Sequence, residues 1–178
     1  MQKILALAGD FYHGADYLRE GLEGILRDKY SLDIKDNYRE IPWQELEEYD
    51  VFILACSGKL NPNDEIWITT EEEFIDNYVS SGGKLLVLHC GLADFSTEGI
   101  LRQVVKGHFL EHPEEHPEIL VSPVKNDLFP VEEIEEFKIV DELYIVDVDL
   151  EDTTVFLQAE SEEYGNAIAG WAHQYGQG

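Results

Sequence analysis

The chain has 178 residues and a mass of 20.4 kDa, and 44% of its residues are hydrophobic, which is ample for one domain with a packed core. Its 38 acidic and 12 basic side chains give a net charge of −26. This charge repels nucleic acid and anionic membrane surfaces, so we expect neither as a partner.

The first half of the chain predicts strands that alternate with helices. Short apolar runs that end at glycine or polar residues are typical of strands buried on both faces. Such strands are predicted at residues 3–8, 50–56 and 84–89, with a further strand at 30–36. Helices are predicted at about 14–29, at 70–80 and through Val105, the second of them opened by a capping box of Thr70 and Glu73.

This alternation predicts a parallel sheet with right-handed crossovers. We therefore expect an α/β protein with a three-layer, flavodoxin-like, mainly parallel sheet and helices on both faces. Beyond Gly107 the pattern changes, and residues 108–117 are predicted to form a polar loop punctuated by proline. Short extended segments are then predicted at 119–124, 144–148, 154–159 and 167–172.

The cysteines and the N-terminal residues indicate the compartment. Only Cys56 and Cys90 occur, both at predicted strand ends, which argues against a disulfide framework and favours a reducing compartment. The N-terminus lacks a signal-peptide pattern, and no stretch approaches the roughly 18 apolar residues of a membrane span. We expect a cytoplasmic protein.

Polar residues gather in the loops after three predicted strands. In an open parallel sheet, ligands bind beyond the carboxyl ends of the strands, so these loops should meet at one edge. The loops contain Asp10, Phe11 and His13, then Cys56, Ser57 and Gly58, and then His89, Cys90 and Gly91. This edge is the predicted functional site.

Cys90 has two interpretations. A neighbouring imidazole and a helix N-terminus would lower its pKa and make it a nucleophile. The alternative is a buried structural cysteine. A nucleophile elbow requires small residues two positions to either side, and Leu88 and Leu92 occupy those positions.

Three histidines, His108, His112 and His116, are spaced four residues apart. On a helix they would share one face, as in zinc sites, but two prolines within the stretch argue against a helix. A loop can still supply ligands, and Glu142 with its neighbour Asp141 would complete a nitrogen and oxygen site for a divalent metal. The alternative is a solvated loop with hydrogen-bonded histidines.

The acidic runs and the pair Trp171 and His173 have structural interpretations. Acidic runs such as 71–73 are predicted to be helix N-termini or solvated faces, without a function. Trp171 and His173 would point the same way from a strand, Trp171 into the core and His173 toward the rim of the site.

Several motifs together resemble those of a known family. They are Gly9-Asp10-Phe11-Tyr12-His13, Gly107-x-Phe109-x-x-His112-Pro113, Asp141-Glu142-x-Tyr144, and Trp171 followed by Tyr175-Gly176-x-Gly178. In this order and spacing the sequence resembles the ThuA-like (trehalose utilisation) family over nearly its whole length. The resemblance implies a class I glutamine amidotransferase-like fold and a role in sugar metabolism, with His89, His112 and Glu142 at the pocket.

Two departures from the resemblance matter. Relatives continue through a further strand, so residues 1–178 are expected to form a single ThuA-like domain that lacks a C-terminal strand. Glutaminases of this fold use a cysteine elbow with a His-x-Glu pair, whereas the C-terminal counterpart here is His173-Gln174-Tyr175. The cysteine chemistry of those enzymes is therefore a less favoured prediction for this chain.

Three functions follow from these observations. The first is an enzyme acting on a disaccharide or keto-sugar by acid/base chemistry. Its predicted catalytic residues are His89, Cys90, His112 and Glu142, and its predicted substrate-binding residues are Asp10, Phe11, His13, Ser57, Gly58, His108, Tyr144 and His173. The second is a noncatalytic sugar-binding domain, and the third is a Cys90-dependent hydrolase. A sugar is the expected partner, and a divalent metal and a homo-oligomer are left open.

Overall fold

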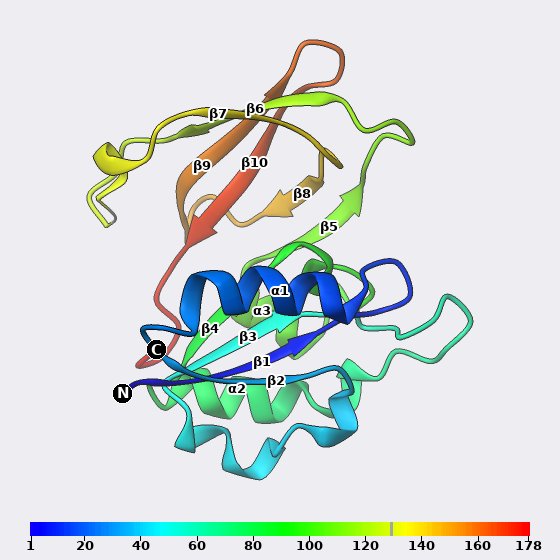
Figure 1. Cartoon of the computed structure of the whole chain (residues 1–178), viewed down its shortest axis with the longest axis vertical. Coiled ribbons are helices and arrows are strands. Elements are labelled where there is room, and N and C mark those ends of the chain that lie inside the picture. The colour runs from blue at the N-terminus through cyan, green and yellow to red at the C-terminus, as the bar shows by residue number, and fades with distance from the viewer. Residues whose placement is uncertain (129) are drawn as a thin grey trace. The chain divides into compact units, whose positions relative to one another are not determined.

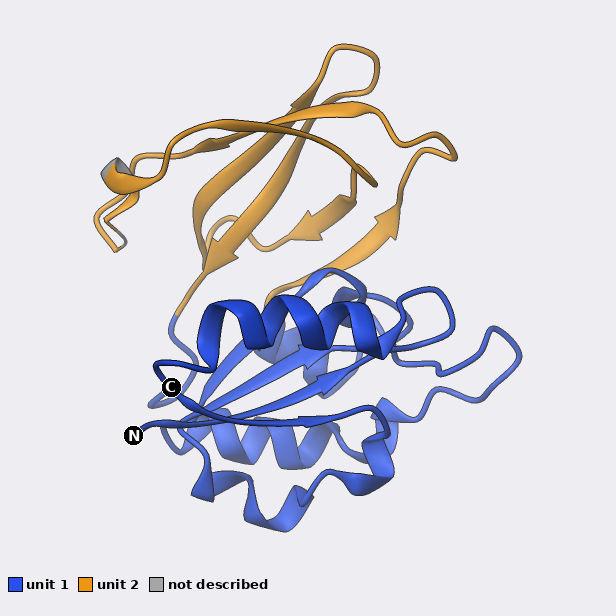
Figure 2. Cartoon of the chain, in the orientation of Figure 1, with its two compact units in different colours: residues 1–105, 174–178 blue, residues 106–173 orange. Residues whose placement is uncertain are grey.

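The structure is a computed structural model that describes residues 1–128 and 130–178. These residues form two compact units (Figure 2). Unit 1 comprises Met1–Val105 and Gln174–Gly178, and unit 2 comprises Lys106–His173. One domain can contain two such units, so a single domain over residues 1–178 stays a prediction, as does a missing C-terminal strand.

Unit 1 contains a four-stranded parallel sheet in the order β2-β1-β3-β4, with helices on both faces (Figure 1). Its strands are β1 (Lys3–Ala8), β2 (Ser31–Lys35), β3 (Val51–Ala55) and β4 (Lys84–Val87). Its helices are α1 (Ala15–Leu26), α2 (Glu72–Ser80) and α3 (Ile100–Val105), with 3₁₀ helices at Tyr38–Glu40, Trp43–Glu48, Ile68–Thr70 and His89–Leu92. The predicted α/β class with a mainly parallel sheet is confirmed.

The core of unit 1 follows from the alternation of side chains along buried strands. Successive residues of a strand point to opposite faces. Ile4 and Ala6 of β1 lie in a buried cluster with Leu22 of α1, on one face of the sheet. On β3, Phe52 is fully buried and packs edge-on against the Trp43 ring, with ring centroids 5.9 Å apart. Because both faces of the sheet are buried, its central strands must be apolar along their whole length, as the sequence predicted.

The acidic run at 71–73 lies at the start of α2, as predicted, but Glu72 is not a solvated side chain. Its side chain is buried, and its Oε2 accepts a hydrogen bond of 3.0 Å from the backbone N–H of Leu101 in α3. The capping box of Thr70 and Glu73 was a wrong prediction, because the Thr70 hydroxyl donates to the Trp67 carbonyl at 2.8 Å instead. The acidic run thus contains one residue that joins α2 to α3.

Unit 2 is built from antiparallel strands. One sheet has the order β10-β9-β6-β7, and a separate pair joins β5 to β8. The strands are β5 (Gly107–Glu111), β6 (Glu118–Pro123), β7 (Phe137–Val140), β8 (Ile145–Val148), β9 (Thr154–Ser161) and β10 (Gly165–Ala172), with a 3₁₀ helix at Val131–Glu133. Ile119, Leu143 and Ala159 form its buried cluster.

The sequence predicted the strands corresponding to β6, β8, β9 and β10 and missed two others. The predicted loop over residues 108–117 is wrong at its start, because His108 and Phe109 belong to β5 and pair with Asp147 and Val146 of β8. Strand β7 also went unpredicted, and its residues are exposed. Both strands depend on partners that are distant in sequence. In the part of the chain that the structure describes, each helix is too short or too polar to cross a bilayer.

Candidate functional site

The loop after β1 is folded around the Asp10 side chain. Gly9 has a φ of +108°, a conformation that favours glycine, and it contacts Ala15 at the start of α1 so closely that a side chain there would collide. Oδ1 of Asp10 accepts hydrogen bonds from the backbone N–H groups of Tyr12 and His13, each at 2.9 Å. This tight turn brings the His13 ring into contact with the Asp10 carboxylate.

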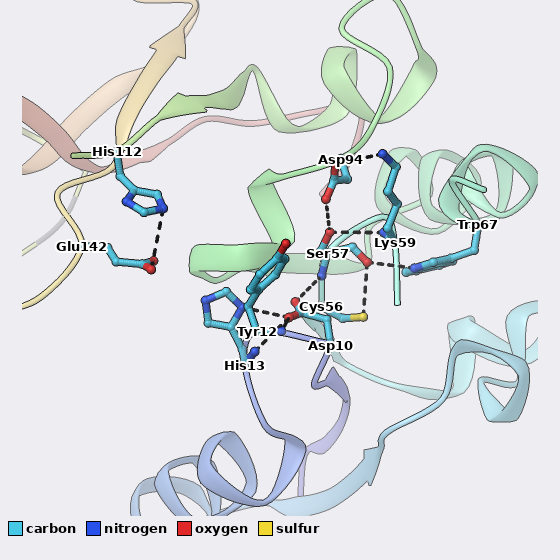
Figure 3. A network of polar contacts seen from close by, with 10 residues as sticks. All are labelled: Asp10, Tyr12, His13, Cys56, Ser57, Lys59, Trp67, Asp94, His112 and Glu142. Atoms are coloured by element: carbon cyan, nitrogen blue, oxygen red, sulfur yellow. Dashed lines mark hydrogen bonds and ion pairs between the residues drawn. The ribbon is translucent and has the colours of Figure 1, made fainter. Parts of the chain in front are cut away.

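Asp10 and His13 form a carboxylate and imidazole pair (Figure 3). Nδ1 of His13 lies 3.0 Å from Oδ1 of Asp10, and the Asp10 side chain is only 1% exposed. Burial acts to raise the pKa of Asp10, but hydrogen bonds from the His13 ring and from the N–H groups of Ser57 and His13 hold that pKa well below its usual range. A carboxylate accepts only, so it favours the His13 tautomer with its proton on Nδ1 and its lone pair on Nε2.

His89 meets this pair from the end of β4. The rings of His13 and His89 are 4.9 Å apart between centroids and nearly perpendicular. His89 has a φ of +45°, a left-handed conformation that is uncommon outside glycine and is concentrated at functional sites. The strained position at the end of this strand, where a nucleophile elbow would place its reactive residue, is therefore occupied by a histidine.

Cys90 and Cys56 are buried, at 1% and 0% exposure. Burial raises the pKa of the Cys90 thiol far above its usual value, and the charge of Asp10 and a hydrogen bond to its carboxylate raise it further. Burial likewise raises the pKa of Cys56 to about 12, with a further contribution from Asp10. These surroundings favour a neutral thiol that supports Asp10, and they do not favour the predicted nucleophile.

The ligand-type atoms of Asp10, His13 and Cys90 lie within 4.8 Å of one another. A metal held by Oδ1 of Asp10 and Nδ1 of His13 would displace the direct hydrogen bond between them. A metal-binding thiol must also lose its proton, which burial of Cys90 opposes. These contacts fit a proton-transfer pair better than a metal centre.

Ser57 and Gly58 were predicted to bind substrate, and in the structure both make contacts that support the loop after β3; Figure 3 shows those of Ser57. The Ser57 hydroxyl donates to Asp94 at 2.6 Å, and its carbonyl accepts from the Trp67 indole at 2.8 Å. Gly58 packs against the Asp94 carbonyl, where a side chain would collide. This network fixes the loop after β3 and directs the Ser57 N–H toward Asp10 at 3.0 Å.

The exposed aromatic rings of this loop are Phe11 and Tyr12. Phe11 is 61% exposed and Tyr12 is 71% exposed, and their rings meet edge to face at 5.0 Å. Exposed aromatic faces beside a polar pair are suited to contact with an apolar face of a ligand.

The remaining predicted site residues belong to unit 2. Nε2 of His112 lies 3.7 Å from Oε1 of Glu142, and the His112 ring is stacked on Tyr144 with centroids 5.9 Å apart. His108 lies elsewhere in the unit, opposite Asp147 in the pairing of β5 with β8, with 3.6 Å between Nδ1 and Oδ2.

His173 directly follows β10, at the end of unit 2. A pocket shared by His89, His112 and Glu142 stays a prediction, because these residues come from different units.

Sequence reasoning missed three residues that support these contacts: Lys59, Trp67 and Asp94. Asp94 has a φ of +59° and lies 37 positions from Ser57, and its Oδ1 lies 3.6 Å from Nζ of Lys59. A pairing of this kind leaves no local pattern in the sequence. His116 lies 3.8 Å from Glu142, and its spacing from His112 was the only signal that pointed to it.

A hollow of about 530 Å³ lies at the opposite, amino edge of the sheet in unit 1. Its lining includes Trp43, Tyr78 and Lys84. It contains none of the predicted site residues among those described, and it lies away from the strand ends where parallel sheets bind ligands. We therefore place the candidate site at Asp10, His13 and His89.

Comparisons with known proteins agree with this fold. The family model for ThuA, described as trehalose utilisation, matches residues 10–178. A ThuA-like protein from Parabacteroides merdae is 14% identical with a TM-score of 0.71, covering 99% of this chain and 76% of that chain. A ThuA-like protein from Bacteroides uniformis is 19% identical with a TM-score of 0.69, covering 97% of this chain and 73% of that chain.

A glutamine amidotransferase from Thermotoga maritima is 18% identical with a TM-score of 0.61, covering 99% of this chain and 72% of that chain. At these identities the structural similarities show the fold alone. No curated protein matches the chain at a significant level.

Proposed function

Since the chain belongs to the ThuA (trehalose utilisation) family, we propose that unit 1 carries a site for acid/base chemistry on a carbohydrate. The observation that carries the proposal is the Asp10 and His13 pair with the His89 ring at 4.9 Å. Two imidazoles and a buried carboxylate are the groups that enzymes use to move protons near neutral pH.

The proposed reaction is proton abstraction from a sugar carbon next to a carbonyl group. Nε2 of His13 takes the proton, the carbon–hydrogen bond breaks, and its electron pair moves to the carbonyl oxygen to give an enolate. Asp10 stays ionised and stabilises the imidazolium that forms, because its pKa is held well below its usual range by the hydrogen bonds it accepts. His89 donates a proton to the enolate oxygen.

The surroundings support a neutral ligand of the sugar type. A net charge of −26 repels phosphorylated and carboxylated compounds but leaves an uncharged sugar unaffected. The exposed Phe11 and Tyr12 rings offer apolar surfaces on which the carbon–hydrogen face of a sugar ring can rest.

Two alternatives from the sequence remain distinct proposals. A noncatalytic sugar-binding domain would use the same aromatic rings and hydrogen-bonding groups without proton transfer. A hydrolase with Cys90 as nucleophile needs a thiolate, and burial raises the pKa of that thiol far above neutrality. The proton-transfer function is therefore preferred over the hydrolase.

Hydrogen exchange with solvent tests the proposal without knowledge of the product. The protein is incubated in D₂O with disaccharides and their keto derivatives, and proton NMR follows the loss of the signal next to the carbonyl. We expect catalysed exchange that His13→Gln slows by about 10²- to 10⁴-fold. Lys29→Gln, an exposed change beyond the far end of α1, is the control and should exchange at the wild-type rate.

Exchange by His13→Gln at the wild-type rate would contradict the role of His13. Sugar binding without exchange by the wild-type protein would favour the noncatalytic domain.

A further inference from the structure

Strand β7 forms an open edge of the antiparallel sheet in unit 2. It is the last strand in the order β10-β9-β6-β7, and among the described strands it pairs with β6 alone. Its four residues are all exposed, and three of them are large and apolar: Phe137 is 49% exposed, Ile139 is 40% exposed and Val140 is 67% exposed. An apolar edge strand is a surface on which another chain can pair.

The backbone groups at this edge follow from the pairing of β7 with β6. The N–H of Asp141 donates to the Pro117 carbonyl at 3.3 Å, so the backbone of Asp141 faces β6. In an antiparallel ladder, successive residues alternate between facing the partner strand and facing away from it. The N–H and C=O groups of Lys138 and Val140 therefore point away from β6, and no backbone group in the described part of the chain bonds to them.

The features that commonly protect an edge strand do not block this one. Strand β7 contains no proline, and its register with β6 is regular. Its charged side chain, Lys138, pairs with Glu118 of β6 at 2.6 Å, and this contact directs the ammonium group away from the open edge. A partner strand can therefore approach the edge.

The exposed rings and chains of β7 continue the core face of the sheet. Phe137 and Ile139 lie opposite Val121 and Ile119 of β6, and Ile119 belongs to the buried cluster of unit 2. Residues that are paired in this way lie on the same face. A partner strand with an apolar residue at every second position would cover Phe137 and Ile139 from the side.

A second copy of the chain is a poor partner for this edge. Two β7 strands related by a twofold axis would pair antiparallel. A register centred on Lys138 would set Glu135 opposite Asp141, and one centred on the next residue would set Glu136 opposite Glu142. Like charges directly opposite each other are destabilising, and each copy carries a net charge of −26.

We propose that the open edge of β7 binds an extended basic peptide segment in which apolar and polar residues alternate. Backbone hydrogen bonds to β7 supply the affinity, and the alternate apolar residues cover Phe137 and Ile139. Lysine or arginine at the ends of the segment complements the exposed Glu135, Glu136 and Asp141, which flank β7. The proposal goes beyond the proton-transfer site of unit 1 and does not depend on it.

Fluorescence anisotropy with the full chain tests the proposal at about 0.15 M salt, which weakens attraction by surface charge alone. The probe is a labelled peptide of alternating valine and threonine with two lysines at each end. One control peptide has the same sequence with N-methyl groups on its central residues, so it keeps the charge and loses the backbone donors. A second control has glutamates in place of the lysines. We expect each control to bind about tenfold more weakly or worse.

Three variants of the chain locate the binding edge. Val140→Pro removes an outward N–H and leaves the groups that face β6 in place, so we expect binding that is about tenfold weaker. Glu136→Lys reverses an exposed charge beside β7 and should weaken binding about threefold or more. Ile25→Ser removes a 73% exposed apolar side chain from α1 and should bind as the wild-type protein does.

The proposal is overturned if the wild-type protein does not bind the peptide, or binds the N-methylated peptide equally well. Wild-type affinity in a folded Val140→Pro, checked by circular dichroism, would also overturn it. If Val140→Pro does not fold, wild-type affinity in Glu136→Lys has the same consequence. Sedimentation of the free chain covers the remaining partner, because a dimer that Glu136→Lys alters would assign the edge to a second copy instead.

Discussion

Oδ1 of Asp10 accepts hydrogen bonds from both the backbone N–H and the ring Nδ1 of His13, at 2.9 and 3.0 Å. One buried oxygen thus fixes the turn of the chain and the orientation of the ring that this turn carries. The same contacts keep Asp10 ionised, since its pKa lies well below the usual range. Stability and the proposed chemistry therefore depend on the same carboxylate.

Asp10→Asn should destabilise the protein by about 2 to 3 kcal/mol at pH 7, because an amide loses the charge that these N–H donors stabilise. A carboxyl whose pKa is lowered by folding stabilises the protein above its unfolded pKa of about 4, and that contribution is lost as the pH falls below this value. The difference in the free energy of unfolding between the wild-type protein and Asp10→Asn should therefore become smaller below about pH 4.

Urea unfolding from pH 7 down to the lowest pH at which both proteins fold measures this difference. If the difference in the free energy of unfolding between the wild-type protein and Asp10→Asn stays constant over that pH range, the charge of Asp10 does not stabilise the protein.

Gly58→Ala should destabilise unit 1 by about 3 kcal/mol or more, because a side chain at Gly58 collides with the Asp94 carbonyl. Gly24→Ala is the matched control. Gly24 lies inside α1 with open space around it, so alanine should stabilise the protein by about 0.5 to 1 kcal/mol. Thermal unfolding of both variants measures the two effects, and a harmless Gly58→Ala would contradict the packing described here.

Ser57→Ala tests whether Ser57 binds substrate or supports the loop. Its hydroxyl donates to Asp94 at 2.6 Å and accepts from the Lys59 N–H at 3.2 Å. We expect a loss of about 1 to 2 kcal/mol of stability from these bonds, with the affinity for sugar nearly unchanged. Calorimetry with the variant measures both quantities, and a large loss of affinity at unchanged stability would restore the predicted substrate contact.

Cys56 and Cys90 should resist alkylation in the folded protein. Both are buried, and burial raises their pKa values, that of Cys56 to about 12, so little thiolate exists at pH 7.5. Mass spectrometry after iodoacetamide treatment should find both thiols unmodified in buffer and modified in urea. Rapid modification of Cys90 in buffer would revive the hydrolase alternative.

The sequence predicted the edge of the sheet where Asp10, His13 and His89 meet. Continuous apolar runs indicated the parallel strands, and parallel strands place their carboxyl ends together, so no long-range contact had to be guessed. The role of Ser57 was not predictable, because it depends on Asp94, whose left-handed backbone has no sequence signature.

Unit 2 was harder to predict because its strands also depend on contacts between residues that are far apart in the sequence. Strand β5 contains polar residues and exists through pairing with β8, about 40 positions later in the chain. The spacing of His112 and His116 suggested a helix that prolines exclude. The two rings instead meet at Glu142 through a loop that the pairing of β6 with β7 positions.

Long-range proton–nitrogen NMR spectra of the His13 ring test most directly whether Asp10 fixes a basic Nε2. The spectra are recorded on ¹⁵N-histidine-labelled protein at a pH where the ring is neutral, and His13→Gln assigns the signals. The geometry predicts a protonated Nδ1 and an unprotonated Nε2 in the wild-type protein, with a shift toward the other tautomer in Asp10→Asn. A wild-type spectrum with the proton on Nε2 would contradict the assignment of His13 as the proton acceptor.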